Sequence, residues 1–160
     1  MTTSQVGRKP PIGLQRLLWR APIWLYRIGL GGLFGKQLML LNHTGRKSGQ
    51  PRQAVVEAAH FDPARNSYTV ASGFGHKSDW YRNVCATPRV TIQVGNRRMQ
   101  ADARPLSPAE SGTAMVEYAH RNPSLARGLA KVIGHQVDGT DEAYRQIAEQ
   151  HIPFVEFRVL

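Results

Sequence analysis

Residues 38–59 read LMLLNHTGRKSGQPRQAVVEAA, two apolar runs joined by a cationic turn. The turn, Gly45–Arg52, holds three cations, a hydroxyl, two glycines and a proline in eight residues. Glycine permits positive φ and exposes backbone N–H groups. Arginine offers phosphate or carboxylate a planar fork, and lysine offers a point charge. We predict that two strands present this turn to an extended anion; taken alone, the motif also fits an ordinary solvated hairpin.

The charge of the whole chain favours an anionic ligand. The first acidic residue is Glu57, nine basic residues precede it, and the 160-residue chain carries a formal net charge of +10. Such an excess indicates an anionic partner: a nucleic acid, an acidic membrane surface or a small polyanionic cofactor. Composition does not choose among the three.

The cysteine and histidine content argues against two kinds of site. Cys85 is the single cysteine, so no internal disulfide forms and a reducing compartment is indicated. We expect Cys85 to be a buried packing residue. The six histidines show no His-x-x-x-His spacing, so no metal site is predicted. A chain of this length is expected to be one domain with its own core.

Residues 12–41 are the candidate for membrane contact. Basic residues interrupt this Leu-, Ile- and Trp-rich stretch, so it lacks the run of about 18 uncharged apolar residues that spans a bilayer. We expect two short helices, Gly13–Arg20 and Pro22–Gly29. They would lie on an anionic membrane surface or cap a substrate pocket. The predicted localisation is cytoplasmic, with the inner face of the plasma membrane as the alternative.

The remaining sequence predicts strands followed by helices. The apolar and alternating runs predict strands at Leu38–Thr44, Gln53–His60, Ser67–Ser72, Arg89–Val94, Arg97–Ala103 and Pro153–Val159. Gly95-Asn96 is a strong two-residue hairpin signal. Helices are predicted from Ser78-Asp79 to before Pro88 and at Pro108–His120, Ser124–Ile133 and Asp141–Gln150, with Ser107 as an N-cap.

These elements predict an α+β, mainly β, fold: a small, partly open antiparallel barrel decorated with helices. Residues 1–37 would form the basic, apolar N-terminal helices, and residues 38–160 the barrel domain. A nucleic-acid-binding barrel would share the charge. However, Phe and Tyr are not concentrated on one strand face, and no RNP-like motif occurs. We therefore predict no nucleic-acid partner.

An ordered set of short motifs resembles the deazaflavin-dependent nitroreductase family. The motifs are Leu40-Leu41 with Thr44–Arg52, then Val70–Gly73, Asp79–Asn83, Pro88–Val90 and Val94-Gly95. The resemblance implies a split β-barrel of the FMN-binding, pyridoxamine-phosphate-oxidase-like type that uses coenzyme F-420. It covers roughly Leu38 to Leu106. The apolar N-terminus and Gly73-Phe74-Gly75 are more similar to the membrane-associated branch of the family than to its soluble nitroreductases.

The resemblance also implies a cofactor site. Coenzyme F-420 carries a flat deazaflavin, a phosphodiester and a γ-linked glutamate tail, so it is multiply anionic. Arg46, Lys47 and Arg52 would bind phosphate and tail. Hydrogen-bond donors would come from Ser48 and Gly49. The strand beneath the ring would comprise Gln53, Ala54, Val55, Val56 and Glu57. The polar edge of the ring would meet Val70, Ala71, Ser72 and Gly73, and the wall of the site would be formed by Asp79, Trp80, Tyr81, Arg82 and Asn83. From the residues alone, Trp80 and Tyr81 would be core anchors and Asn83 a helix-surface residue.

Two positions depart from the family pattern. Gly73 stands where relatives often carry Lys, which removes one cation from the site. Glu57 stands where several relatives carry an aromatic residue near the substrate.

The implied activity is hydride transfer between the deazaflavin C5 and a lipophilic unsaturated or electron-poor substrate: a quinone, enone, nitro compound or fatty acyl chain. No Ser/His/Asp or Cys/His constellation indicates a nucleophile. Tyr81 and Tyr118 are the candidate proton donors. One alternative is a lipid or fatty-acid carrier without redox chemistry. Another is an FMN-dependent split-barrel oxidoreductase, although FMN has no glutamate tail to explain the clustered cations. A homodimer is a further expectation, because split barrels often dimerise.

Overall fold

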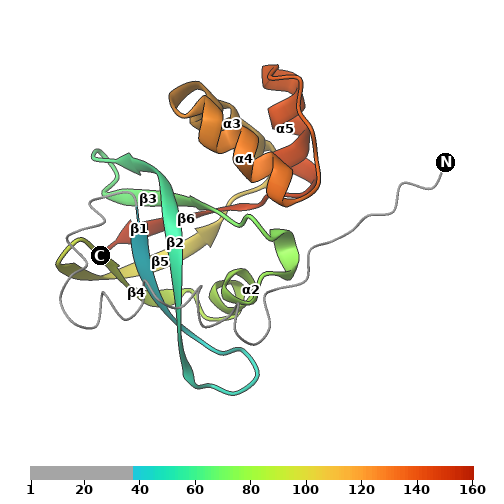
Figure 1. The fold of residues 1–160 in the computed structure, drawn as a ribbon. Helices are drawn as coiled ribbons and strands as arrows, with labels where there is room; N and C mark the ends of the chain where they lie inside the picture. Colours follow the sequence, from blue (N-terminus) through green and yellow to red (C-terminus); the bar gives the residue numbers. More distant parts are fainter. Residues whose placement is uncertain (1–37) are drawn as a thin grey trace. The chain divides into compact units, whose positions relative to one another are not determined.

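The computed structural model describes residues 38–160, which form two compact units. The barrel unit comprises residues 38–71, Asp79–Pro105 and Val155–Leu160, and the helical unit comprises Ser72–Ser78 and Leu106–Phe154. Figure 1 traces the elements along the chain. The expected helices Gly13–Arg20 and Pro22–Gly29 lie outside the described residues. The division into an N-terminal segment and one barrel domain stays a prediction.

Six strands close into a barrel in the order β1-β2-β3-β6-β5-β4 (Figure 1). They are β1 Leu38–Thr44, β2 Pro51–Asp62, β3 Ser67–Ala71, β4 Arg89–Val94, β5 Arg97–Pro105 and β6 Phe154–Val159. Every predicted strand is present. The barrel is closed rather than partly open, because β4 pairs with both β5 and β1 while β6 lies between β3 and β5.

The barrel core follows from the alternation of side chains along each strand. Met39 and Leu41 on β1, Val70 on β3, Ile92 on β4 and Phe157 on β6 have no exposed surface. Successive strand residues point to opposite faces, so one face of each strand fills the interior. β2 is long enough to pair with β1 through its first half and with β3 through its second. The register shifts between Ala58 and His60, where a bulge bends the strand.

Helix α2, Asp79–Ala86, belongs to the barrel unit. Val84 lies in the barrel core, and Trp80 and Tyr81 pack against it. The prediction that Cys85 is buried is wrong: its side chain is exposed. Successive helical residues point about 100° apart, so Cys85 turns away from the face on which Val84 is buried.

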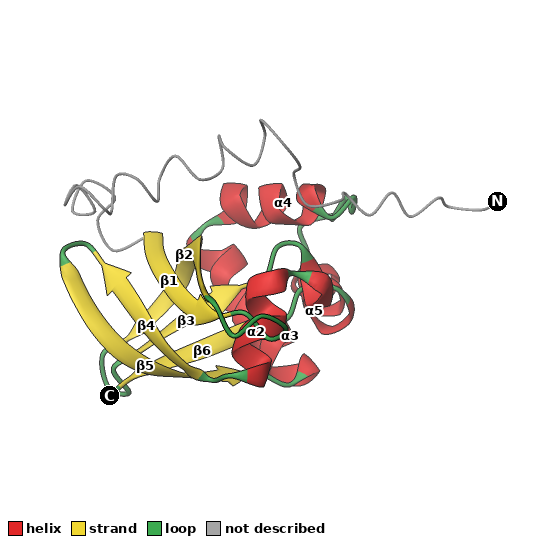
Figure 2. Cartoon of the chain, turned by 90° about the horizontal axis from the view of Figure 1, so that it is seen from below, coloured by secondary structure: helices red, strands yellow, loops and turns green. Residues whose placement is uncertain are grey.

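The helical unit contains α3 Pro108–Arg121, α4 Pro123–Val132 and α5 Asp141–Gln150, all predicted from sequence (Figure 2). It also contains a 3₁₀ turn, η2 Gly75–Lys77, that was not predicted. The Ser107 cap is confirmed. Its hydroxyl accepts from the Glu110 backbone N–H at 3.2 Å, and the Glu110 carboxylate accepts from the Ser107 N–H at 2.8 Å. None of the helices within residues 38–160 has the length and apolar character needed to cross a bilayer.

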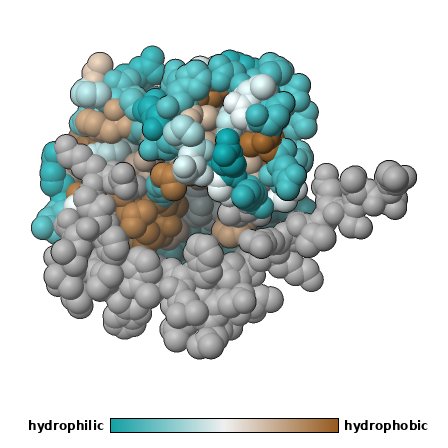
Figure 3. Space-filling view, turned by 45° about the horizontal axis from the view of Figure 1, so that its top comes forward, coloured by the Kyte–Doolittle hydropathy of each residue, from teal (hydrophilic) through white to brown (hydrophobic). Residues whose placement is uncertain are grey.

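The described surface is largely hydrophilic on the face shown in Figure 3, with smaller apolar areas. Among the described residues, the exposed large apolar side chains are Phe74, Leu125 and Leu160.

Candidate functional site

The cationic turn has a closed backbone. The Gly45 N–H donates to the Gln50 carbonyl and the Gly49 N–H to the Gly45 carbonyl, each at 2.8 Å. The Gln50 N–H donates to the Ser48 hydroxyl at 3.2 Å. Gly49 has a φ of 68°, which favours glycine. A Cβ on Gly45 would lie only 2.6 Å from Ser48 Oγ. Glycine is therefore favoured at position 49 by its backbone, and a side chain at position 45 would displace the Ser48 hydroxyl.

Asn83 on α2 ties the turn to the barrel. Its Oδ1 accepts hydrogen bonds from the Arg46 backbone N–H at 3.1 Å and from Arg46 Nη1 at 2.9 Å. Its Nδ2 lies 3.1 Å from Nδ1 of His43 on β1. The side chain is 4% exposed, so the interpretation of Asn83 as a helix-surface residue is wrong. Periodicity within α2 did not reveal this burial, because it depends on the turn packed above the helix.

The three cations of the turn have different surroundings. The Arg46 guanidinium bonds to Asp79 Oδ1 at 3.2 and 3.3 Å as well as to Asn83, and its side chain is 18% exposed. Lys47 and Arg52 are exposed, and within residues 38–160 neither forms an ion pair with a carboxylate. The Arg52 Nη2 lies 3.5 Å from the Ser48 hydroxyl. Lys47, Arg52 and Ser48 thus offer an outside anion two positive charges and one hydroxyl.

His43 is a site residue that sequence reasoning missed. It is 7% exposed and shares the inward face of β1 with Met39 and Leu41, an alternation that was available as a signal. Burial, followed by the positive charge of Arg52, lowers the pKa of His43 from 6.5 to about 4, although Asp79 opposes this. His43 is therefore neutral at physiological pH.

The β2 residues predicted to lie beneath a ring divide between two faces. Ala54 and Val56 pair with Leu41 and Met39 and point into the barrel core. The other face carries Gln53, Val55 and Glu57, where Gln53 Nε2 donates to Asn42 Oδ1 at 2.8 Å. Ala54 and Val56 can therefore offer a ligand their backbone but not their side chains.

The Val70–Gly73 segment is shared between the barrel unit and the helical unit. Val70 is buried in the barrel core and Ala71 ends β3, whereas Ser72 and Gly73 belong to the helical unit. The buried Ser72 hydroxyl donates to the Gly75 carbonyl at 2.7 Å. A Cβ on Gly73 would lie 3.0 Å from Leu129 Cδ1 of α4. A lysine at this position would thus require Leu129 to give way.

The aromatic candidates are placed as follows. Trp80 and Tyr81 lie edge to face with ring centroids 6.2 Å apart, and both pack against the barrel core, as the residues alone predicted. Burial, followed by the neighbouring Cys85, raises the pKa of the Tyr81 hydroxyl, so Tyr81 keeps its proton at neutral pH. Tyr118 is buried on α3 of the helical unit. On α2, Asp79 and Arg82 are exposed.

The sequence of the chain is similar to that of a known protein family. The model of the F420H(2)-dependent quinone reductase family matches residues 20–127. The chain belongs to this family. It is 32% identical over 90 residues to the F420H(2)-dependent quinone reductases of two Mycobacterium tuberculosis strains, H37Rv and CDC 1551, over 52% of this chain and 60% of each relative. The alignment therefore spans less than two thirds of the length of these curated relatives.

Solved structures confirm the predicted split β-barrel fold. The F420-H2-dependent reductase FDR-A superposes with a TM-score of 0.52 at 20% identity, over 78% of this chain and 96% of that one. General Stress Protein 26 of Bacillus anthracis gives a TM-score of 0.51 at 14% identity, over 88% and 89%. At these identities the likeness establishes the fold. The family membership, in turn, implies coenzyme F-420 as the cofactor, as predicted.

The residues of the turn fit the anionic part of such a cofactor. A guanidinium, an ammonium and a hydroxyl are the groups that bind phosphate and carboxylate. Here Arg52, Lys47 and Ser48 lie within one turn, and no carboxylate neutralises Lys47 or Arg52 within the described part of the chain. Residues 38–160 contain no group of three His, Cys, Asp or Glu side chains placed to hold a metal ion.

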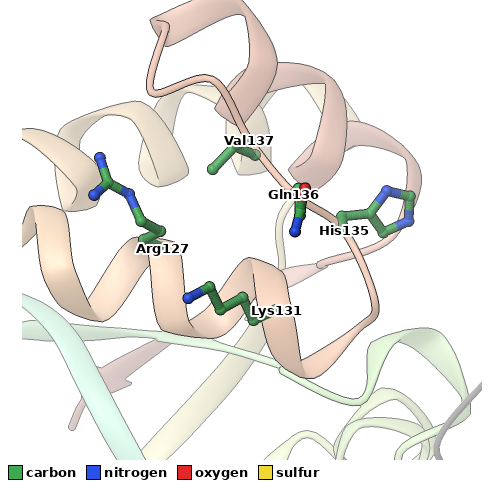
Figure 4. Close-up of a pocket in the computed structure, with 5 residues that line it drawn as sticks. All are labelled: Arg127, Lys131, His135, Gln136 and Val137. Atoms are coloured by element: carbon green, nitrogen blue, oxygen red, sulfur yellow. The ribbon is translucent and has the colours of Figure 1, made fainter.

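The helical unit also contains a small pocket. In the helical unit, α4 and the loop after it line a small pocket of about 150 Å³ (Figure 4). Its lining consists of Arg127, Lys131, His135, Gln136 and Val137. Figure 4 shows Arg127 and Lys131 rising from the same helix, while the His135 ring points away. None of these residues was predicted to bind a ligand.

Proposed function

We propose that this family member is a coenzyme F-420-dependent oxidoreductase whose substrate is a lipophilic, electron-poor molecule, with a quinone as the first candidate. The observation that carries the proposal is the cationic turn, where Lys47 and Arg52 stand exposed without acidic partners in the described chain. Membership of the quinone reductase family supports both the cofactor and the substrate class. Enones, nitro compounds and fatty acyl chains remain secondary substrates to be assayed beside quinones.

The protein contributes binding and orientation rather than a nucleophile. When bound, coenzyme F-420 supplies a hydride at its C5. Lys47, Arg52 and the Ser48 hydroxyl hold its anionic part, and the backbone of the closed turn keeps these groups in place. The remaining predicted contacts on β2, at Val70–Gly73 and along Asp79–Asn83 are part of this proposal.

A proton is also required to complete the reduction of a quinone. The Tyr81 hydroxyl stays protonated because its pKa is raised, so it is able to give a proton at Oη. Tyr118, buried on α3, is the second proton-donor candidate. A Tyr81→Phe variant that keeps full turnover at every pH would assign the proton to another group.

Ligand titrations test the proposal against its alternatives. We expect tryptophan fluorescence to respond to coenzyme F-420 at lower concentration than to FMN or a fatty acid, because FMN has no glutamate tail. Oxidation of the reduced coenzyme should then accelerate when a quinone is added. Tight fatty-acid binding without any response to coenzyme would instead support a lipid carrier, for which the glycine at position 73 is the favouring feature. Preferential binding of FMN would support an FMN-dependent enzyme.

Two further parts of the proposal concern assembly and location. The basic, apolar stretch at residues 12–37 supports peripheral contact with an anionic membrane surface at the inner face of the plasma membrane. Sedimentation with anionic but not zwitterionic vesicles is expected, and equal recovery with both would overturn the contact. We also propose a homodimer, which light scattering on a size-exclusion column checks directly.

A further inference from the structure

We propose that His43 is a positioning residue that acts through the Asn83 amide. It holds Arg46 in place by hydrogen bonds within the protein, and Lys47 and Arg52 are then the cations that bind the ligand's anionic group. The proposal rests on the proposed function for the identity of the ligand. Its structural part concerns the protein alone and is testable without any ligand. It also changes the role of Arg46, which the family resemblance counted among the anion-binding cations.

The hydrogen-bond chemistry of Asn83 has a single solution. The Arg46 backbone N–H and guanidinium are donors only, so Asn83 must turn Oδ1 toward them, at 3.1 and 2.9 Å. Nδ2 is then directed at His43 Nδ1, 3.1 Å away. An NH₂ group only donates, so His43 Nδ1 must carry its lone pair and the ring proton must sit on Nε2. Hydrogen-bond donation therefore runs in one direction, from Arg46 in the turn to Asn83 and from Asn83 to His43 on β1.

Protonation of His43 would break this arrangement. An Nδ1–H facing the Asn83 NH₂ places two donors together, and rotation of the amide to relieve this would turn its NH₂ toward Arg46. The charged groups that act on the ring are Arg52 on β2 and Asp79 on α2, and Asp79 is itself paired with Arg46 of the turn. Burial and Arg52 keep the ring neutral, because they outweigh Asp79. The network is thus intact at neutral pH.

In the same network, the charge of Arg46 is used within the protein, whereas the charge of Arg52 is available to a ligand. Arg46 gives its backbone N–H to Asn83 and its guanidinium to both Asn83 and Asp79. Arg52 pairs across the strands with His43 but directs Nη2 toward Ser48 Oγ in the exposed part of the turn.

Amide exchange of the unliganded protein tests the structural part. His43→Leu removes the acceptor, whereas His43→Asn places Oδ1 where Nδ1 now lies. We expect the Arg46 amide to exchange about tenfold faster in His43→Leu and at close to the parent rate in His43→Asn. Leu41→Ala, two residues earlier on the same face of β1, is the matched control for lost packing. Equal protection of Arg46 in the parent and His43→Leu would overturn the proposal.

A measurement on the parent covers the case in which His43→Leu does not fold. In an NMR titration from pH 7 to about 3.5, which passes through the His43 pKa of about 4, the Arg46 amide shift should follow the ring shifts of His43. Titration of His43 with no response at Arg46 would contradict the proposal. Coenzyme F-420 is then the ligand probe: His43→Leu should weaken its binding more than His43→Asn. If no coenzyme binds to the parent, the proposed function fails, while the exchange result still decides the role of His43.

Discussion

At the scale of single residues, the turn shows that a positively charged side chain is not always available to bind a ligand. Arg46 is as cationic as Arg52, yet its donors are used by Asp79 and Asn83. Sequence alone does not distinguish the two, because the difference arises from α2, 33 to 37 residues further along the chain. His43 escaped notice for the same reason: its partner Asn83 is adjacent only in the fold.

The depressed pKa of His43 predicts an acid-sensitive stability. The folded protein holds the ring neutral until about pH 4, whereas the unfolded chain binds the proton near pH 6.5. Below pH 6.5 the unfolded state therefore binds more protons, and the free energy of unfolding falls as the pH drops toward 4. We expect a loss on the order of 2 kcal/mol over this range relative to His43→Asn, measured by urea denaturation at several pH values. Parallel pH profiles for the two proteins would be inconsistent with this pKa.

At the scale of elements, the turn and the strands that hold it were the most predictable part of the molecule. Local signals placed β1, β4, the Gly95-Asn96 hairpin and the Ser107 cap within a residue or two. The bulge between Ala58 and His60 and the division of β2 into two faces were not foreseen, because they depend on which strand pairs on each side. The exposure of Cys85 likewise depends on which face of α2 the barrel covers.

Two glycine substitutions should have opposite effects on stability. Gly45→Ala places a Cβ 2.6 Å from Ser48 Oγ and should cost about 1–3 kcal/mol of unfolding free energy. Gly128→Ala, in α4 with nothing within 4 Å of its new Cβ, should stabilise by about 0.5–1 kcal/mol. Thermal and chemical denaturation check both signs. A harmless Gly45→Ala would show that the turn readily takes another form.

Glu156 on β6 should be important for the barrel unit. The residue is 6% exposed, and its carboxylate lies 3.5–3.6 Å from Arg65, Arg104 and Arg158. Glu156→Gln keeps the shape but removes the charge shared by three arginines, so we expect a loss of about 1–2 kcal/mol, limited by the exposure of those arginines. Glu117→Gln on α3 removes an exposed carboxylate and is the control. Equal denaturation midpoints for the two variants would argue against a role for this cluster.

At the scale of the whole molecule, the fold and the family followed from an ordered set of short motifs, while the substrate did not. The six strands could be predicted from the sequence, but the closure of the barrel could not. Closure requires β6, which follows three helices, to return between β3 and β5. The function resides in groups displayed on this scaffold, so the fold alone does not assign it. The net positive charge favours an anionic ligand, and membership of the family implies coenzyme F-420 as the cofactor.

The most direct test compares coenzyme binding by three proteins. We expect fluorescence titration with coenzyme F-420 to show saturable binding by the parent and by Arg98→Ala, an exposed arginine on β5 outside the turn. Lys47→Ala/Arg52→Ala should bind at least about a hundredfold more weakly, since each lost charge-assisted contact is worth about 1.5–3 kcal/mol. Unchanged affinity in the double variant, or no binding by the parent, would contradict the account.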